Sequence, residues 1–144
     1  MDYWLFKTEP GTYSFETLMK EKKTNWDHVR NFQARNVLKL CQVGDYALIY
    51  HRGEERAVVG LAKITKTAYP DPDPLKKGDW VQVDLKFQLL VTESVPLSRL
   101  KSTASLKDLA LIKQSRLSCM QVTSKEFETI LKLGISWDAF QKLK

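Results

Sequence analysis

Two neighbouring apolar runs constrain the fold of this chain more than any other feature. Residues 46–50 and 57–64 are almost continuously apolar, and the polar loop Arg52-Gly53-Glu54-Glu55 lies between them. A short glycine-containing loop between two such runs is typical of a β-hairpin. Because neither run alternates between apolar and polar residues, both faces of both strands are expected to be buried. The pattern predicts that this hairpin lies inside the protein.

Three further segments have the patterns of strands. Residues 2–8 are apolar on both faces, which is typical of a strand inside a closed barrel. Residues 80–90 alternate, which predicts a long strand with Gln82 and its polar neighbours on a solvent-facing side. Residues 117–122 predict a last strand. Between these segments, residues 69–74 contain three prolines and predict a rigid loop.

Short helices are expected between the strands, and capping residues place several of them. Ser14 is a candidate N-cap for a helix over 15–23. Thr123 and Glu126 match a capping box for a helix that ends at Leu133, and Gly134 follows as the C-cap glycine. The other predicted helices cover residues 33–40, 96–100, 106–112 and 135–144. Together the elements predict an α+β fold, a small β-barrel of five or six mostly antiparallel strands surrounded by short helices.

Composition narrows the class of protein. The 144 residues fit one domain, 1–144, and no apolar run approaches the roughly 20 residues needed to span a bilayer. The start of the chain lacks a signal-peptide pattern, so a cytoplasmic location is expected. Cys41 and Cys119 have no metal-ligand spacing and are expected to be buried, reduced thiols. We therefore expect no metal and no cofactor.

The net charge of +6, from 23 basic and 17 acidic residues, favours a partner that carries phosphate. Residues 26–36 add a second indication of such a partner. This segment combines Trp26 and Phe32 with two arginines and three amides. Such a mixture suits a site that stacks on a flat ring, hydrogen-bonds its edge and holds a nearby anion.

Several phrases of the sequence, in order along the chain, resemble the EVE domain family. The phrases cover residues 3–10, 26–36, 43–51, 59–71 and 111–118. The resemblance implies a fold of the PUA superfamily, related to the YTH readers of methylated adenine. It also implies a function as a reader of a modified base, with modified cytosine in DNA the main ligand class and RNA a further one. Two departures from the family pattern, His28 and Arg52, affect the expected identity of the ligand.

A reader of this kind holds a base out of its helix, so its site must recover the cost of flipping by stacking and by hydrogen bonds to the base edge. Trp26, with Trp4 or Tyr50, is expected to stack on the base, although each ring has core packing as its alternative. Asn31, Ser115 and Glu9 are expected to read the edge. For Asn31 the alternative is a helix cap. The predicted base-binding set is Trp4, Glu9, Trp26, Val29, Asn31, Tyr50, His51, Ser115 and Leu117.

The cations near these residues are candidates for phosphate contacts, with an exposed salt bridge as the alternative for any single arginine. The predicted phosphate-binding set is Lys7, Arg30, Arg35 and Arg116.

The sequence thus predicts a non-catalytic domain, expected to be a monomer with no membrane partner, that binds nucleic acid carrying a modified base. An enzyme acting on nucleic acid is the first alternative, but no GxGxxG phosphate loop and no HxE with CxxC zinc-deaminase pattern occurs. A second alternative is a protein-interaction module that uses the proline-rich loop, or an accessory subunit of a nucleic-acid-modifying enzyme.

Overall fold

The predicted hairpin forms the centre of a six-stranded sheet in the computed structural model, which describes residues 1–27, 29–72 and 78–143. Its strands are β3 (Tyr46–His51) and β4 (Ala57–Pro70). All six residues of β3 are buried, as are residues 57–62 of β4, so the expectation of burial on both faces is confirmed. The apolar runs therefore form the interior of the sheet.

Across the described residues the strand order is β2-β5-β4-β3-β1-β6. The flanking strands are β1 (Tyr3–Thr8), β2 (Lys23–Trp26), β5 (Val81–Pro96) and β6 (Cys119–Val122). β1 pairs with β3 in parallel, and the other pairs are antiparallel. The prediction of an α+β fold with mostly antiparallel strands is therefore confirmed.

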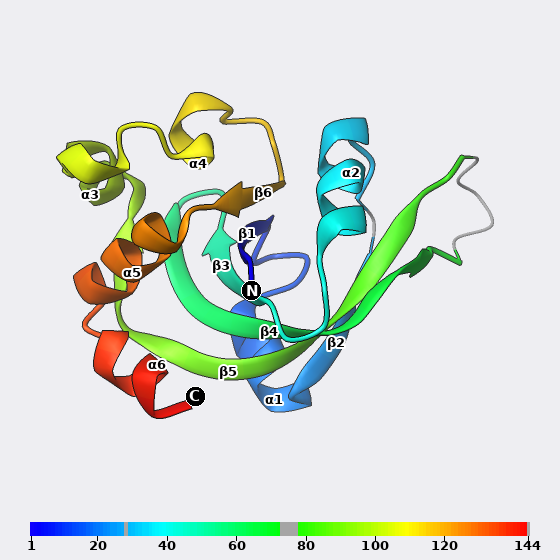
Figure 1. The fold of residues 1–144 in the computed structure, drawn as a ribbon, viewed down its shortest axis with the longest axis horizontal. Coiled ribbons are helices and arrows are strands. Elements are labelled where there is room, and N and C mark those ends of the chain that lie inside the picture. The colour runs from blue at the N-terminus through cyan, green and yellow to red at the C-terminus, as the bar shows by residue number, and fades with distance from the viewer. Residues whose placement is uncertain (28, 73–77, 144) are drawn as a thin grey trace.

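The expected closure into a barrel is wrong, because the sheet is open between β2 and β6. Each of these outer strands has only four residues, and α2 (Phe32–Leu40) lies in the gap between β6 and the β4–β5 hairpin (Figure 1). Ala34 and Leu38 of α2 are fully buried. The helix thus covers the opening with apolar side chains instead of hydrogen-bonded backbone.

The β4–β5 hairpin is longer than predicted. β4 runs through Tyr69 and Pro70, which pair with Gln82 and Val81 and therefore belong to a strand and not to a loop. β5 extends to Pro96, and several register shifts interrupt its pairing with β4. The strict alternation predicted for β5 fails at Gln82, which is buried instead of solvent-facing and whose Oε1 accepts a hydrogen bond from Nδ2 of Asn25 in β2. Asp71 and Pro72 follow the end of β4 outside any helix or strand, and residues 73 and 74 of the predicted loop lie outside the described residues.

Six α-helices and one 3₁₀ helix lie in the described part of the chain. Their bounds are α1 (Phe15–Glu21), α2, α3 (Leu97–Ser102), η1 (Ala104–Leu106), α4 (Ala110–Lys113), α5 (Ser124–Leu133) and α6 (Trp137–Leu143). The Ser14 cap, the capping box of α5 and the C-cap at Gly134 are confirmed. β2 was not predicted, because its sequence, Lys-Thr-Asn-Trp, has no apolar alternation.

The parallel pairing of β1 with β3 brings the ends of both strands, Thr8 and His51, to the same edge of the sheet. The start of α2 and the segment that leads from α4 into β6 lie side by side at the upper edge of the molecule (Figure 1). The start of α2 and the loop before β6 are far apart in sequence but close in space, and the candidate site lies between them. No helix in the part of the chain that the structure describes is long and apolar enough to cross a membrane.

Candidate nucleic-acid interface

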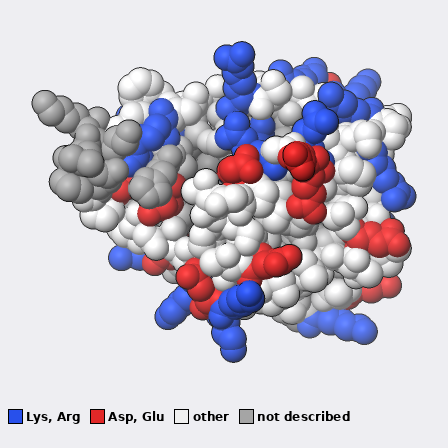
Figure 2. Space-filling model, turned by 180° about the vertical axis from the view of Figure 1, so that it is seen from behind, with Lys and Arg blue, Asp and Glu red and all other residues white. Residues whose placement is uncertain are grey.

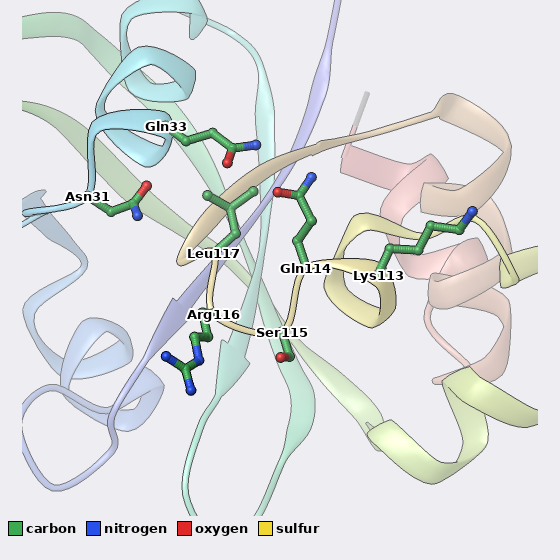
Figure 3. Close-up of a pocket in the computed structure, with 7 residues that line it drawn as sticks. All are labelled: Asn31, Gln33, Lys113, Gln114, Ser115, Arg116 and Leu117. Atoms are coloured by element: carbon green, nitrogen blue, oxygen red, sulfur yellow. The ribbon is translucent and has the colours of Figure 1, made fainter.

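A hollow of about 350 Å³ lies between the start of α2 and the loop that leads into β6. Its lining residues are drawn in Figure 3: Asn31, Gln33, Lys113, Gln114, Ser115, Arg116 and Leu117. The volume falls in the range of roughly 300–1,000 Å³ that is usual for small-molecule sites. The lining combines amides, a hydroxyl, a guanidinium group and one apolar side chain.

Asn31 is placed at the hollow by its role as the N-cap of α2. Its Oδ1 accepts a hydrogen bond from the backbone N–H of Ala34 at 2.9 Å, and the cap alternative for Asn31 is therefore confirmed. The cap engages the carbonyl oxygen of the amide, and the same side chain lines the hollow. One side chain therefore starts the helix and also contributes an amide to the site.

The loop on the other side of the hollow is anchored from below by Lys7 of β1. The backbone N–H of Lys7 donates to the carbonyl oxygen of Ser118 at 2.8 Å, and its Nζ donates to the carbonyl oxygen of Ser115 at 2.6 Å. Lys7 is only 8% exposed. Burial, and then the nearby positive charge of Arg52, lowers the pKa of the Lys7 ammonium group.

The side chains around the hollow offer hydrogen-bonding groups beside an apolar surface. Gln33 of α2 and Gln114 of the loop extend toward one another, and Leu117 lies between them (Figure 3). Leu117 is 5% exposed and Arg116 is exposed. Amide groups can both donate to and accept from the edge of a base, and a guanidinium group can bind phosphate. The arrangement suits a flat polar ring attached to an anionic backbone.

Four residues predicted from the sequence meet at this hollow: Asn31, Ser115, Arg116 and Leu117. Three lining residues were not in the predicted set: Gln33, Lys113 and Gln114. A signal for two of them was available, because Gln33 lies two residues after the cap Asn31 and Gln114 directly precedes Ser115. Lys113 forms an ion pair with Asp108 at 3.1 Å and points away from the other lining residues (Figure 3).

Two residues predicted to contact the base instead form hydrogen bonds within the protein. Trp4 is 1% exposed, and its indole N–H donates to Oδ2 of the buried Asp45 at 2.9 Å. His51 is 6% exposed; its Nε2 accepts from the backbone N–H of Phe15, and its Nδ1 lies 2.6 Å from Oε1 of Glu55. The structure places both residues in the core network, which favours a structural role over the predicted contact with a base.

Three other members of the predicted base-binding set are also buried. Trp26 is 8% exposed and packs against Phe6 and Tyr13, at ring-centroid distances of 5.8 and 6.2 Å. Val29 and Tyr50 are similarly buried. A stacking role for Trp26 stays a prediction, and it would require more of the ring to become accessible.

The remaining predicted residues lie around the site. Glu9 is exposed, with its carboxylate beside Gly53 in the β3–β4 turn. Arg30 forms an ion pair with Asp71 at 3.1 Å, and the guanidinium carbon of Arg35 lies 5.0 Å from the centre of the Phe32 ring. Lys7, predicted to bind phosphate, instead directs its ammonium group at the Ser115 carbonyl.

The charge of the surface is uneven. On the back of the molecule, Lys and Arg side chains lie along the upper edge and also along the bottom, and Asp and Glu side chains lie between these two groups (Figure 2). The upper edge is also the side on which α2 begins and the loop enters β6. In residues 1–27, 29–72 and 78–143, no group of three His, Cys, Asp or Glu residues could hold a metal ion.

Known proteins share the fold of this chain, and one of them also has a similar sequence. Human thymocyte nuclear protein 1 is 35% identical over 91% of this chain and 73% of that protein. The structure of the human protein in complex with DNA containing 5-methylcytosine superposes with a TM-score of 0.85, at 35% identity over 93% of this chain and 98% of the human one. A YTH domain from Zygosaccharomyces rouxii shares the fold, with a TM-score of 0.59 at 16% identity over 92% and 86% of the two chains.

The model of the EVE domain matches residues 2–133, which include every element from β1 to the end of α5. This match and the human relative agree with the resemblance seen in the sequence phrases, and the chain belongs to the EVE domain family.

Proposed function

We propose that this protein is a non-catalytic reader of a modified base, with 5-methylcytosine in DNA as the primary ligand. The observation that carries the proposal is the hollow between α2 and the loop before β6, in which amides from two elements face one another across an apolar side chain. The human relative that was crystallised with 5-methylcytosine DNA supports the choice of ligand.

Each lining group has a role in this proposal. The carboxamides of Asn31, Gln33 and Gln114 hydrogen-bond the edge of the base, because an amide can match both the exocyclic amine and the carbonyl of cytosine. The side chain of Leu117 packs against the methyl group that distinguishes the modified base. Arg116 binds a flanking phosphate. Flipping a base out of its duplex costs a few kcal/mol, and these contacts offset that cost.

Two substitutions of Asn31 test the proposal, because they separate the helix cap from the ligand contact. Serine also caps helices through its side-chain oxygen but has no carboxamide, whereas alanine provides neither. We expect Asn31→Ser to retain the thermal stability of the protein and to lose roughly tenfold in affinity for 5-methylcytosine DNA. Asn31→Ala should lose that affinity and also about 1 kcal/mol of stability.

The measurement is binding to matched oligonucleotides, unmodified or carrying 5-methyl- or 5-hydroxymethylcytosine, as DNA and as RNA at two salt concentrations. Preference for a modified base that Asn31→Ser abolishes would support the reader and locate its pocket. Equal, strongly salt-dependent binding to all of the oligonucleotides would show phosphate attraction alone and would overturn the proposal.

A further inference from the structure

We propose that Phe32 and Trp80, with Arg35, form a platform on which the protein stacks a second nucleobase, the neighbour of the base held in the hollow. This inference rests on the proposed function and adds a second contact point on the nucleic acid. The platform lies outside the hollow, on the other side of the start of α2.

The two rings form a stack at the surface. Phe32 is the first residue of α2, and Trp80 directly precedes β5. Their ring centroids are 5.1 Å apart with an interplanar angle of 20°, yet Phe32 remains 66% exposed. A large aromatic side chain that is stacked on another ring and still mostly exposed gains little from folding, so its exposure calls for a ligand.

The platform is held in place by ion pairs on both sides. Lys39 of α2 pairs with Asp79 at 2.5 Å, and Arg30 pairs with Asp71 at 3.1 Å. The Arg30 pair connects the segment before Phe32 to Asp71, whose backbone N–H donates to the carbonyl oxygen of Trp80 at 3.0 Å. The Lys39 pair connects the far end of α2 to the residue before Trp80. The platform is therefore organised before any ligand binds, which lowers the entropic cost of stacking.

Arginine side chains lie against the two rings, and their charge indicates which class of ligand the platform binds. The guanidinium carbon of Arg35 is 5.0 Å from the centre of the Phe32 ring and 5.8 Å from that of Trp80, and that of Arg30 is 5.6 Å from the Trp80 ring. Aromatic rings combined with guanidinium planes are typical of surfaces that stack bases and attract phosphate. An apolar protein segment would gain nothing from these cations, so the charge favours a nucleobase.

The order of residues in α2 makes the platform continuous with the hollow. Asn31 and Gln33 line the hollow, and Phe32 stands between them in sequence and faces Trp80 instead. The two surfaces thus share one helical turn. A strand that places one base in the hollow would bring its next nucleotide to the platform.

Three variants test the platform. Phe32→Ala removes the ring, Phe32→Leu keeps apolar surface without a ring, and Leu40→Ala removes another exposed apolar side chain, 61% exposed, at the far end of the same helix. Each is assayed with oligonucleotides that carry 2-aminopurine, a fluorescent base, beside a cytosine or a 5-methylcytosine. The readouts are affinity, the ratio of affinities for modified and unmodified strands, and the emission of 2-aminopurine.

We expect Phe32→Ala to weaken binding of both strands by roughly five- to a hundredfold, the range for loss of one base–aromatic stack, and to leave their ratio unchanged. Emission should be quenched by the wild-type protein and by Leu40→Ala, but much less by Phe32→Ala or Phe32→Leu. Unchanged affinity and quenching in Phe32→Ala would overturn the platform, even if the preference for 5-methylcytosine persists. If instead neither strand is preferred but Phe32→Ala still weakens binding and quenching, the platform stands and the modified-base proposal fails.

Discussion

At the scale of single residues, Lys7 shows how a side chain expected at the ligand can act from beneath the site. Its sequence position, at the end of a strand in a basic protein, suggested a phosphate contact. In the structure it is 8% exposed and its ammonium group donates to the carbonyl of Ser115. The pKa of Lys7 is lowered, first by burial. The cation most able to meet a phosphate at the hollow is Arg116, which is exposed.

This difference predicts opposite behaviour for two substitutions. Arg116→Ala should remove about one phosphate contact and reduce the salt dependence of binding, the slope of log K against log [salt], by about 0.7–0.9. Lys7→Met should leave that slope unchanged but weaken discrimination between modified and unmodified bases, because the loop that lines the hollow loses its anchor. Titrations at several salt concentrations measure both quantities. A reduced slope in Lys7→Met would show that the ammonium group contacts phosphate after all.

At the scale of elements, the packing of α1 on the sheet depends on a glycine in β4. A Cβ built on Gly60 would lie 2.1 Å from Cζ of Phe15, a buried residue of α1. The backbone N–H of Phe15 in turn donates to Nε2 of His51 in β3. Glycine at position 60 therefore lets α1 approach the sheet closely enough to make this hydrogen bond.

We expect Gly60→Ala to destabilise the protein by about 1–3 kcal/mol, as overpacking of a filled core usually does. Urea denaturation followed by circular dichroism measures the change. Gly11→Ala is a matched control, since no atom lies within 4 Å of a Cβ at that position. The double variant with Gly60→Ala and Phe15→Leu should lose less free energy of unfolding than the sum of the losses in the two single variants. Strict additivity would show that the Phe15 ring is not the obstacle.

At the scale of the whole molecule, two cysteines that lie far apart in sequence report on the integrity of the core. Cys41 follows the end of α2, and Cys119 begins β6; both are buried free thiols. Burial raises the pKa of Cys41 and raises the pKa of Cys119 to about 12. The reactive thiolate form of each is therefore scarce while the protein is folded.

We predict that iodoacetamide at pH 8 alkylates both thiols roughly a hundredfold or more slowly in the folded protein than in denaturant. Mass spectrometry of samples taken over time gives the rate for each cysteine. The alkylation rates of Cys41 and Cys119 should be equal if the sheet opens only as a unit. Rapid labelling of Cys119 alone would instead show that β6, an edge strand, opens locally.

Local sequence determined much of this protein. The continuous apolar runs predicted the buried hairpin, because such strands are stable only when both faces are covered. The cap at Ser14 and the capping box at Thr123 predicted the starts of two helices, since capping depends on residues within one turn. The segment around Asn31 and the one around Ser115 were each identified as candidate binding segments, and the family phrases predicted the EVE domain.

Tertiary structure decided what depends on long-range placement. The sheet stays open between β2 and β6 while α2 packs against β6, β4 and β5, and Gln82 is buried and accepts a hydrogen bond from Asn25 of β2. The sequence left open whether Trp4 packs in the core or lines a pocket, and the position of Asp45, 41 residues away, decides this. The antiparallel pairing of β1 with β6 places Lys7 beside the loop near Ser115, 108 residues later in the chain, and that loop lines the hollow. Short-range hydrogen bonds and apolar patterns can be read from neighbouring residues, whereas these contacts exist only once the chain has folded.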